Sequence, residues 1–147
     1  MGAATAGTDY LAPAAIGTTV QAYDADTAKT DVVQTFSAVQ TMGTAINEHS
    51  VAVAASDINL ALGNFFTKTI AALTTFTVSN VPTTGSAASF ILDLTNGAAF
   101  AITWWAGVKW AGGTAPALTA AGRDSLGFYT YDGGTTWTGL VLAKDVK

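Results

Sequence analysis

The sequence contains no cysteine, a single histidine and only three prolines among 147 residues. Without cysteine the chain has neither a disulfide framework nor a thiolate metal site. His, Asp and Glu do not recur at the spacings of metal-binding loops either. The one histidine, His49, follows Glu48, but no nucleophile motif accompanies this pair. We therefore expect no catalytic residues, no metal and no cofactor.

Charge is also scarce, because only 11% of the residues are charged and the formal net charge is −4 at pH 7. No basic cluster is present, so we expect no binding to nucleic acid. No apolar run approaches the ~20 residues that cross a bilayer, and no leader with a charged and then an apolar region is found. We expect no membrane insertion and no secretion signal.

Apolar residues, in contrast, make up half of the chain. A small protein with so little charge and so much apolar surface typically buries part of that surface in an assembly. A self-associating protein is therefore expected.

The clearest structural signal is a hairpin near the C-terminus. Two β-type runs, Leu126–Tyr131 and Thr136–Leu142, flank a turn that contains Asp132 and two glycines. Asp-Gly and Gly-Gly supply the positive φ angles of tight turns. Tyr129 and Tyr131 share one face of the first run, opposite its other bulky side chains. Bulky residues on both faces indicate a sheet covered twice, by its own core and by a neighbour.

Short β-type runs separated by turn residues continue through the chain from Ser50. The other predicted strands are Val51–Ala55, Ile58–Leu62, Phe65–Ala71, Thr74–Ser79, Ala88–Leu94, Phe100–Trp105 and Val108–Trp110. This spacing is typical of sandwiches, jelly rolls and barrels. We expect an all-β domain at 50–147, a β-sandwich or jelly-roll-like fold.

Residues 1–30, the first part of an N-terminal arm and connector at 1–49, are rich in Gly, Ala and Thr. Their bulky residues are too few to form a core. Those that could anchor the segment to a partner are Tyr10, Leu11, Ile16, Val20 and Tyr23. The segment is either a disordered tail or an extended attachment arm that docks by these anchors, and we favour the arm. Residues 31–48 combine helical spacing with strand-forming residues, which predicts a short helix or a connector.

All four tryptophans lie in the last third of the chain, at Trp104, Trp105, Trp110 and Trp137. Such rings either fill a core and a subunit seam or stack on sugar rings. Adjacent residues of a strand face opposite sides, so one of Trp104 and Trp105 should point away from the core. The candidate sugar-stacking ring is that of Trp105 or Trp110. Tyr131 and Asp132 complete this candidate glycan or interface site.

Two segments resemble phage proteins. Ile16–Thr27 (IGTTVQAYDADT) resembles a short segment that recurs in phage tail-fibre and related virion proteins, and residues 57–147 resemble a β-domain at the ends of such proteins. The features that carry the second likeness are Asn64-Phe65-Phe66-Thr67, Phe90–Leu94, Val108-Lys109-Trp110, Gly112–Pro116 and Phe128–Trp137.

This resemblance implies a non-enzymatic virion structural protein, commonly a homotrimer, attached by its N-terminal part and exposed at its C-terminal part. A tail fibre usually carries a long shaft, whereas fewer than fifty residues precede the β-domain here. A tail- or head-fibre component and a capsid decoration protein are therefore both open, with a stand-alone carbohydrate-binding module as a further alternative. The expected partners are copies of the chain, other virion proteins and a host-surface glycan.

Overall fold

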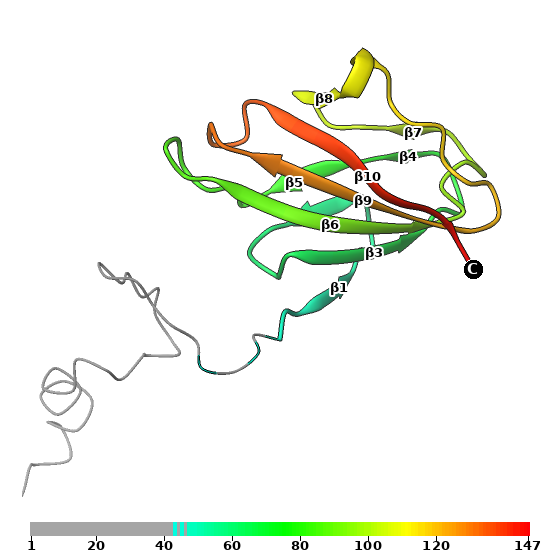
Figure 1. Cartoon of the computed structure of the whole chain (residues 1–147), viewed down its shortest axis with the longest axis horizontal. Helices are drawn as coiled ribbons and strands as arrows, with labels where there is room; N and C mark the ends of the chain where they lie inside the picture. Colours follow the sequence, from blue (N-terminus) through cyan, green and yellow to red (C-terminus); the bar gives the residue numbers. More distant parts are fainter. Residues whose placement is uncertain (1–42, 44, 46) are drawn as a thin grey trace, which may run out of the picture. The chain divides into compact units, whose positions relative to one another are not determined.

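The computed structural model describes residue 43, residue 45 and residues 47–147. Within them residues 47–147 form one compact unit whose regular secondary structure is almost entirely β-strand (Figure 1). The strands are β1 (Ser50–Ala52), β2 (Asp57–Asn59), β3 (Phe65–Thr69), β4 (Thr74–Thr75), β5 (Thr77–Ser79), β6 (Ala88–Thr95), β7 (Ile102–Thr103), β8 (Val108–Trp110), β9 (Arg123–Thr130) and β10 (Trp137–Val146). One 3₁₀ turn lies at Ala111–Gly113. The prediction of an all-β domain is confirmed.

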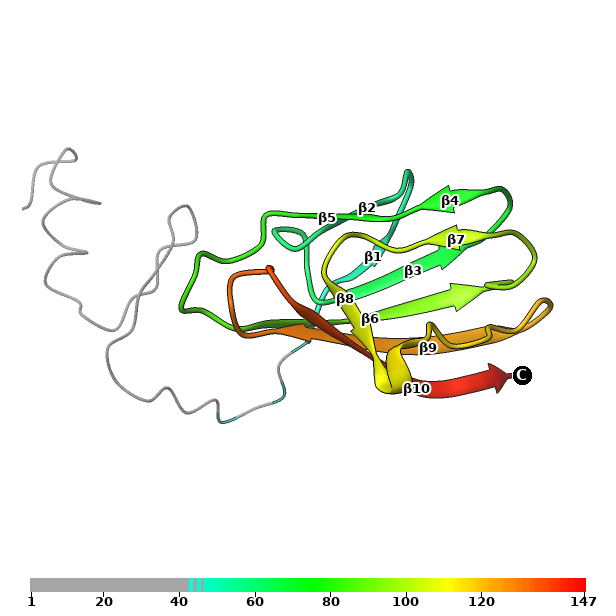
Figure 2. The same ribbon diagram turned by 90° about the horizontal axis from the view of Figure 1, so that it is seen from above.

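The strands form two layers (Figure 2). The larger layer is a six-stranded mixed sheet in the order β1-β3-β6-β9-β10-β8, and the smaller one contains the parallel pairs β2-β5 and β4-β7. Phe76 joins β4 to β5, and its N–H donates to the Thr103 carbonyl oxygen at 2.9 Å. The N–H of the next residue, Thr77, donates to the Ser56 carbonyl oxygen at 3.0 Å. β4 and β5 thus run in line between β7 and β2.

The first half of the domain winds between the layers. The segments after β1, β3 and β6 each cross to the smaller layer, as β2, as β4 with β5, and as β7. Because the chain returns to the large sheet each time from the other layer, β1, β3 and β6 run parallel to one another. The hairpin of β9 and β10 then extends the sheet with antiparallel pairing.

The core lies between the layers and takes alternate residues of the central strands. Across the large sheet, Phe66 of β3 is paired with Leu92 of β6, which is paired with Leu126 of β9. The buried hydrophobic residues are Val53, Ile58, Phe66, Ile70, Phe76, Phe90, Leu92, Leu94, Leu126, Phe128 and Trp137. Trp137, which is 1% exposed, therefore belongs to the core.

The prediction that Trp104 and Trp105 face opposite sides of a strand is wrong. β7 ends at Thr103, so strand alternation does not apply to the two tryptophans. Both rings pack against the core. Trp104 is stacked on Phe76 with ring centroids 5.6 Å apart, and the Trp105 ring lies 4.8 Å from that of Phe128.

A lysine ties the first crossing to the large sheet. The Lys68 ammonium on β3 donates hydrogen bonds to the carbonyl oxygens of Val53 at 3.1 Å, Ala54 at 3.4 Å and Ala55. These carbonyls lie between β1 and β2, where the chain leaves the sheet. A cation therefore satisfies backbone acceptors that no strand partner reaches.

Candidate functional site

The two faces of the large sheet differ sharply in exposure. On β9 the side chain of Phe128 points to the core and is 2% exposed, whereas the next residue, Tyr129, points outward and is 41% exposed. Apolar side chains continue on the outer face of the neighbouring strands. We call this surface the outer patch, formed by Ile91, Gly127, Tyr129, Leu140 and Leu142.

A glycine shapes the centre of the outer patch. Gly127 is paired with Ile91 on one side and Leu140 on the other. A Cβ atom at Gly127 would lie 3.3 Å from the methyl carbons of Leu142, so this leucine lies over the glycine backbone. A register shift between Val141 and Ala143 places Leu142 there. The outer patch therefore has a small hollow bordered by large apolar side chains.

The patch continues onto an open edge of β10. β8 is paired only with the start of β10, at Trp137–Gly139. From Leu140 onward that edge has no strand partner within residues 47–147. Leu140, Val141 and Leu142 are 43%, 45% and 53% exposed. An unpaired edge with consecutive exposed apolar residues is a feature that proteins avoid unless it serves association.

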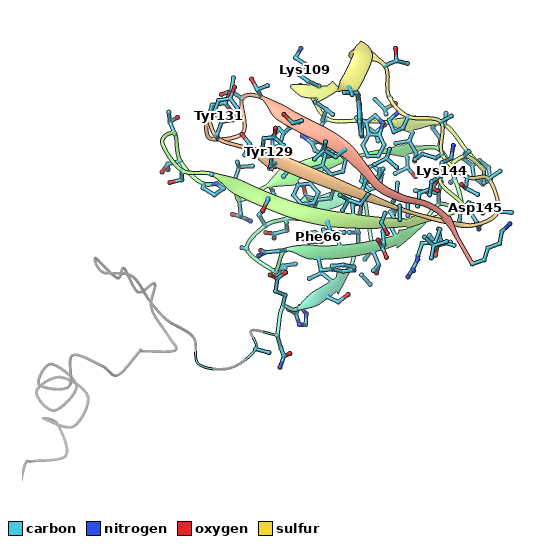
Figure 3. All side chains as sticks on the ribbon, viewed as in Figure 1. Phe66, Lys109, Tyr129, Tyr131, Lys144 and Asp145 are labelled. Carbon is cyan, nitrogen blue, oxygen red and sulfur yellow. The ribbon has the colours of Figure 1, made fainter. Side chains whose placement is uncertain are left out.

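Charged groups close the opposite end of the outer face. Asp93 accepts a hydrogen bond from the Ser125 hydroxyl and lies 3.4 Å from an Arg123 guanidinium nitrogen. In Figure 3, Tyr129 and Tyr131 lie together near the hairpin turn, and Lys144 and Asp145 lie at the far end of the sheet. The outer patch is thus bounded by polar groups, as interface cores commonly are.

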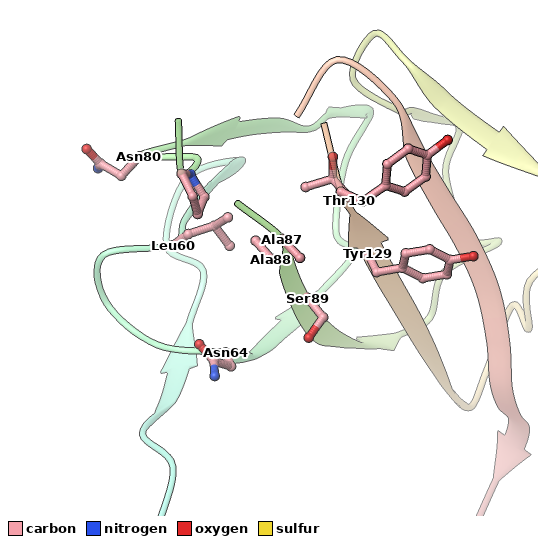
Figure 4. Close-up of a pocket in the computed structure, with 10 residues that line it drawn as sticks. Leu60, Asn64, Asn80, Ala87, Ala88, Ser89, Tyr129 and Thr130 are labelled. Carbon is pink, nitrogen blue, oxygen red and sulfur yellow. The ribbon is translucent and has the colours of Figure 1, made fainter. Parts of the chain in front are cut away.

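Two hollows meet beside Tyr129. One has a volume of about 510 Å³ and the other about 300 Å³, and they share Asn64, Ser89 and Tyr129. The larger one, drawn in Figure 4, is lined entirely by uncharged residues. We call it the tyrosine groove, and its polar and aromatic members are Asn64, Asn80, Ser89, Tyr129, Thr130 and Tyr131.

A hydrogen bond holds one amide side chain of the tyrosine groove, that of Asn80. Asn80 has a positive φ of 53° and donates from its Nδ2 to Asn59 Oδ1 at 2.7 Å. Asn59 Oδ1 also accepts from the Ala61 N–H at 3.0 Å, which fixes its orientation. The main-chain carbonyl oxygen of Asn64 accepts from the Ile91 N–H at 2.8 Å. The groove is therefore built on hydrogen-bonded backbone.

The structure separates the tryptophans of the predicted glycan site from its tyrosine. Tyr131 is 68% exposed and lines the tyrosine groove. Trp105 lines a different cavity of about 440 Å³. Trp110 is half-buried, and its ring lies 5.3 Å from that of Trp104 and 5.5 Å from that of Phe128. The aromatic neighbour of Tyr131 in the groove is Tyr129, which the candidate site did not include.

Asp132 closes the hairpin turn. Its Oδ1 accepts hydrogen bonds from the Thr136 N–H and the Thr130 hydroxyl, both at 2.9 Å. The hydrogen bond from the Thr136 backbone is the main cause that lowers the pKa of Asp132. Gly133 and Gly134 have φ angles of 71° and 85°, as the turn chemistry predicts. The Asp132 carboxylate is thus engaged inside the turn.

The predicted attachment arm lies outside the described residues. This applies to Tyr10, Leu11, Ile16, Val20 and Tyr23, and to most of the predicted helix or connector at 31–48. Residues 47–49, which are described, lie in neither a helix nor a strand.

Two other features are absent from the described residues. They contain no group of three or more His, Asp or Glu side chains that could hold a metal ion. No helix in this part of the chain is long and apolar enough to span a membrane.

Comparison of the chain with protein-family models, with curated protein sequences and with solved structures finds no match. The resemblance to phage virion proteins therefore stays a prediction.

Proposed function

We propose that this chain is a non-enzymatic structural protein of a phage virion, a fibre-type component whose β-domain associates with its own copies as a homotrimer. The observation that supports this proposal best is the outer patch together with the open edge of β10. Exposed apolar side chains on an unpaired strand are costly in a monomer and useful in an assembly.

A closed ring of three copies would cover both features at once. In a heterologous contact, each copy presents one surface to a different surface of the next copy. The edge at Leu140–Leu142 of one copy would pack against the outer patch of its neighbour. Each Å² of apolar surface removed from water contributes about 25 cal/mol, so covering several exposed leucines and tyrosines favours association.

The charge distribution is compatible with such close packing. Residues 51–147 contain five acidic and five basic side chains, so the β-domain carries no formal net charge. Copies of this domain repel one another little, and Glu48 is the one charged residue among those that line the hollow on the outer patch. The acidic excess of the protein lies in the first fifty residues, which we assign to attachment.

In this proposal the N-terminal arm docks onto other virion proteins through its apolar anchors, and the β-domain faces outward. The arm anchors are Tyr10, Leu11, Ile16, Val20 and Tyr23. Extended segments with spaced bulky residues dock by ordering against a partner surface. The protein would thus be located in the virion.

Two measurements test the proposal separately. Light scattering of the full chain should give about three times the chain mass of 14.9 kDa. Mass spectrometry of purified phage particles from cells that encode the chain should detect it as a component of the particle. A monomeric mass would contradict the assembly role, and absence from purified particles would contradict the virion location.

A further inference from the structure

A hollow of about 440 Å³ lies beside β5, in the smaller layer. One of its walls is formed by residues 75–78 and another by residues 104–106, which follow β7. We propose that this hollow, which we call the β5 hollow, binds an extended, uncharged peptide segment of a partner protein that pairs with β5 as an added strand. This inference goes beyond the assembly role and does not depend on it.

The added strand would continue the line of β7, which ends early. β4 and β5 run in line, but only β4 is paired with β7, whose last residue, Thr103, is paired with Thr75. Past β7 the chain turns away towards β8, whereas β5 continues beside β2 (Figure 2). An unpaired strand edge presents a row of backbone N–H and C=O groups, which is the surface that an extended peptide recognises. The edge of β5 opposite β2 is therefore open to a further strand.

The hydrogen bonds of β5 show which backbone groups face the hollow. The Phe76 N–H donates towards β7, to Thr103, and the Thr77 N–H donates to the opposite side, to Ser56. Because successive residues of a strand direct their N–H groups to opposite edges, the Val78 N–H points to the same edge as the Phe76 N–H. Within the described residues the Val78 N–H has no backbone acceptor. The N–H and C=O groups of Val78 are therefore available to an added strand.

The lining of the β5 hollow suits an apolar side chain of that strand. Its aromatic members are Phe76, Trp104, Trp105 and Trp137, and no charged residue of the described chain lines it. A charged side chain placed there would lack a counter-charge. The Trp105 indole nitrogen is buried without a hydrogen-bond acceptor in the described part of the chain, which is unfavourable. A small rotation of the Trp105 ring would let this N–H donate to a carbonyl oxygen of the added strand.

The experiment adds the acetylated and amidated peptide Ser-Thr-Ser-Leu-Ser-Thr-Ser to the full chain and follows the N–H groups by NMR. In the free protein the Val78 N–H should exchange with solvent faster than the hydrogen-bonded N–H groups of Phe76 and Thr77. The peptide should slow the exchange of the Val78 N–H and shift the Trp105 indole signal. A peptide with Ala in place of Leu should bind about 10-fold more weakly, because less apolar surface is buried, and one with Glu should bind more weakly still.

A matched pair of surface variants locates the binding. Ala106 is exposed and lines the hollow, so Ala106→Lys places a long charged side chain there and should weaken binding about 10-fold or more. Ala61 is also exposed but does not line the hollow, so Ala61→Lys should bind the leucine peptide like the wild type. Both variants should keep the urea midpoint of the wild type, because both substitutions are on the surface.

Three outcomes would overturn the inference: the leucine peptide does not bind at millimolar concentration, it binds without slowing the exchange of the Val78 N–H, or Ala106→Lys binds it as tightly as Ala61→Lys does. No residue of the outer patch lines the β5 hollow, so these measurements report on the hollow rather than on assembly. A trimer that binds no peptide would overturn the inference about the hollow alone. A monomer that binds the peptide would overturn the assembly role alone.

Discussion

The two faces of the large sheet come from the same strands but differ in what covers them. On the inner face, Phe90, Leu92, Leu126 and Phe128 are at most 3% exposed and pack under the smaller layer. On the outer face, the leucines and the tyrosine of the outer patch are 41–53% exposed. The inner face and the outer patch are both apolar, yet only the inner face is buried within the domain.

This difference separates residues that stabilise the fold from residues available to a partner. The inner face supplies the aromatic packing that holds the layers together, for example the Phe90 ring, which lies 5.1 Å from that of Phe128 and 5.5 Å from that of Trp137. The outer face adds little to the folding of a single copy, because its side chains stay in contact with water. Apolar side chains that do not stabilise the monomer indicate an association surface.

Replacing one leucine on each face should give the largest difference in the free energy of unfolding. Leu126→Ala removes a fully buried side chain and should lower the free energy of unfolding by about 2–5 kcal/mol. Leu142→Ala removes a side chain that is 53% exposed and should lower it by about 0.5 kcal/mol or less. Urea unfolding at low protein concentration, where copies are dissociated, measures both. Equal losses would remove the distinction between the faces.

Replacing Gly139 or Gly127 by alanine should also have different effects on stability. A Cβ atom at Gly139 would lie 2.5 Å from a ring carbon of Trp110, so Gly139→Ala should displace this tryptophan and cost about 1–3 kcal/mol. Gly127→Ala meets only the flexible Leu142 side chain at 3.3 Å. It should change stability little, since the alanine also restricts the unfolded chain. Urea unfolding followed by tryptophan fluorescence distinguishes the two. A larger loss for Gly127→Ala would contradict the packing described here.

How far the sequence predicts this arrangement depends on whether the signal is local. The hairpin and the alternation of Phe128 with Tyr129 follow from period two and from the turn residues, so both could be predicted. The parallel pairing of Phe66 with Leu92 could not be predicted. The chain crosses the smaller layer between these two strands, and no local sequence pattern indicates which strand pairs with which. Turn signals alone do not distinguish such a crossing from a hairpin.

The candidate site was predicted only in part for the same reason. The pattern of the hairpin identifies Tyr131, whereas Asn64, Asn80 and Ser89 come from three separate segments that only the fold brings together. Tyr129 could have been included, since its alternation with buried side chains places it on the face of Tyr131. Trp105 and Trp110 are partly buried against the core, a placement that the sequence pattern does not reveal.

A buried carboxylate at the end of the inner face gives a pH-dependent effect. Burial raises the pKa of Asp124, but hydrogen bonds from the Thr119 and Asp145 N–H groups and the Thr119 hydroxyl outweigh it, so the pKa is lowered. A lowered pKa in the folded state means that the carboxylate stabilises the fold above its unfolded pKa. This stabilisation is lost as the pH falls through the folded pKa.

Asp124→Asn should therefore cost about 1–3 kcal/mol at neutral pH, because an amide cannot accept the same hydrogen bonds. The difference in unfolding free energy between wild type and variant should shrink from about pH 5 towards pH 2. Urea unfolding of both proteins at several pH values measures this difference in unfolding free energy. A difference that stays constant over this range would show that the charge of Asp124 has no part in stability.

The smallest effect on folding, and the most direct test of the account, comes from the outer patch itself. Leu140→Asn combined with Leu142→Asn should leave the urea midpoint of the dissociated protein nearly unchanged, since surface substitutions typically change stability by about 0.5 kcal/mol or less. Leu62→Asn combined with Leu73→Asn is the matched control, because these leucines are 55% and 73% exposed away from the patch.

Light scattering of the full chain and of both double variants tests whether the outer patch holds the copies together. The wild type and the Leu62/Leu73 control should have the mass of a trimer, whereas the Leu140/Leu142 variant should be a folded monomer. A Leu140/Leu142 variant that stays trimeric, or a wild type that is itself monomeric, would contradict the claim that the outer face of this sheet is an assembly surface.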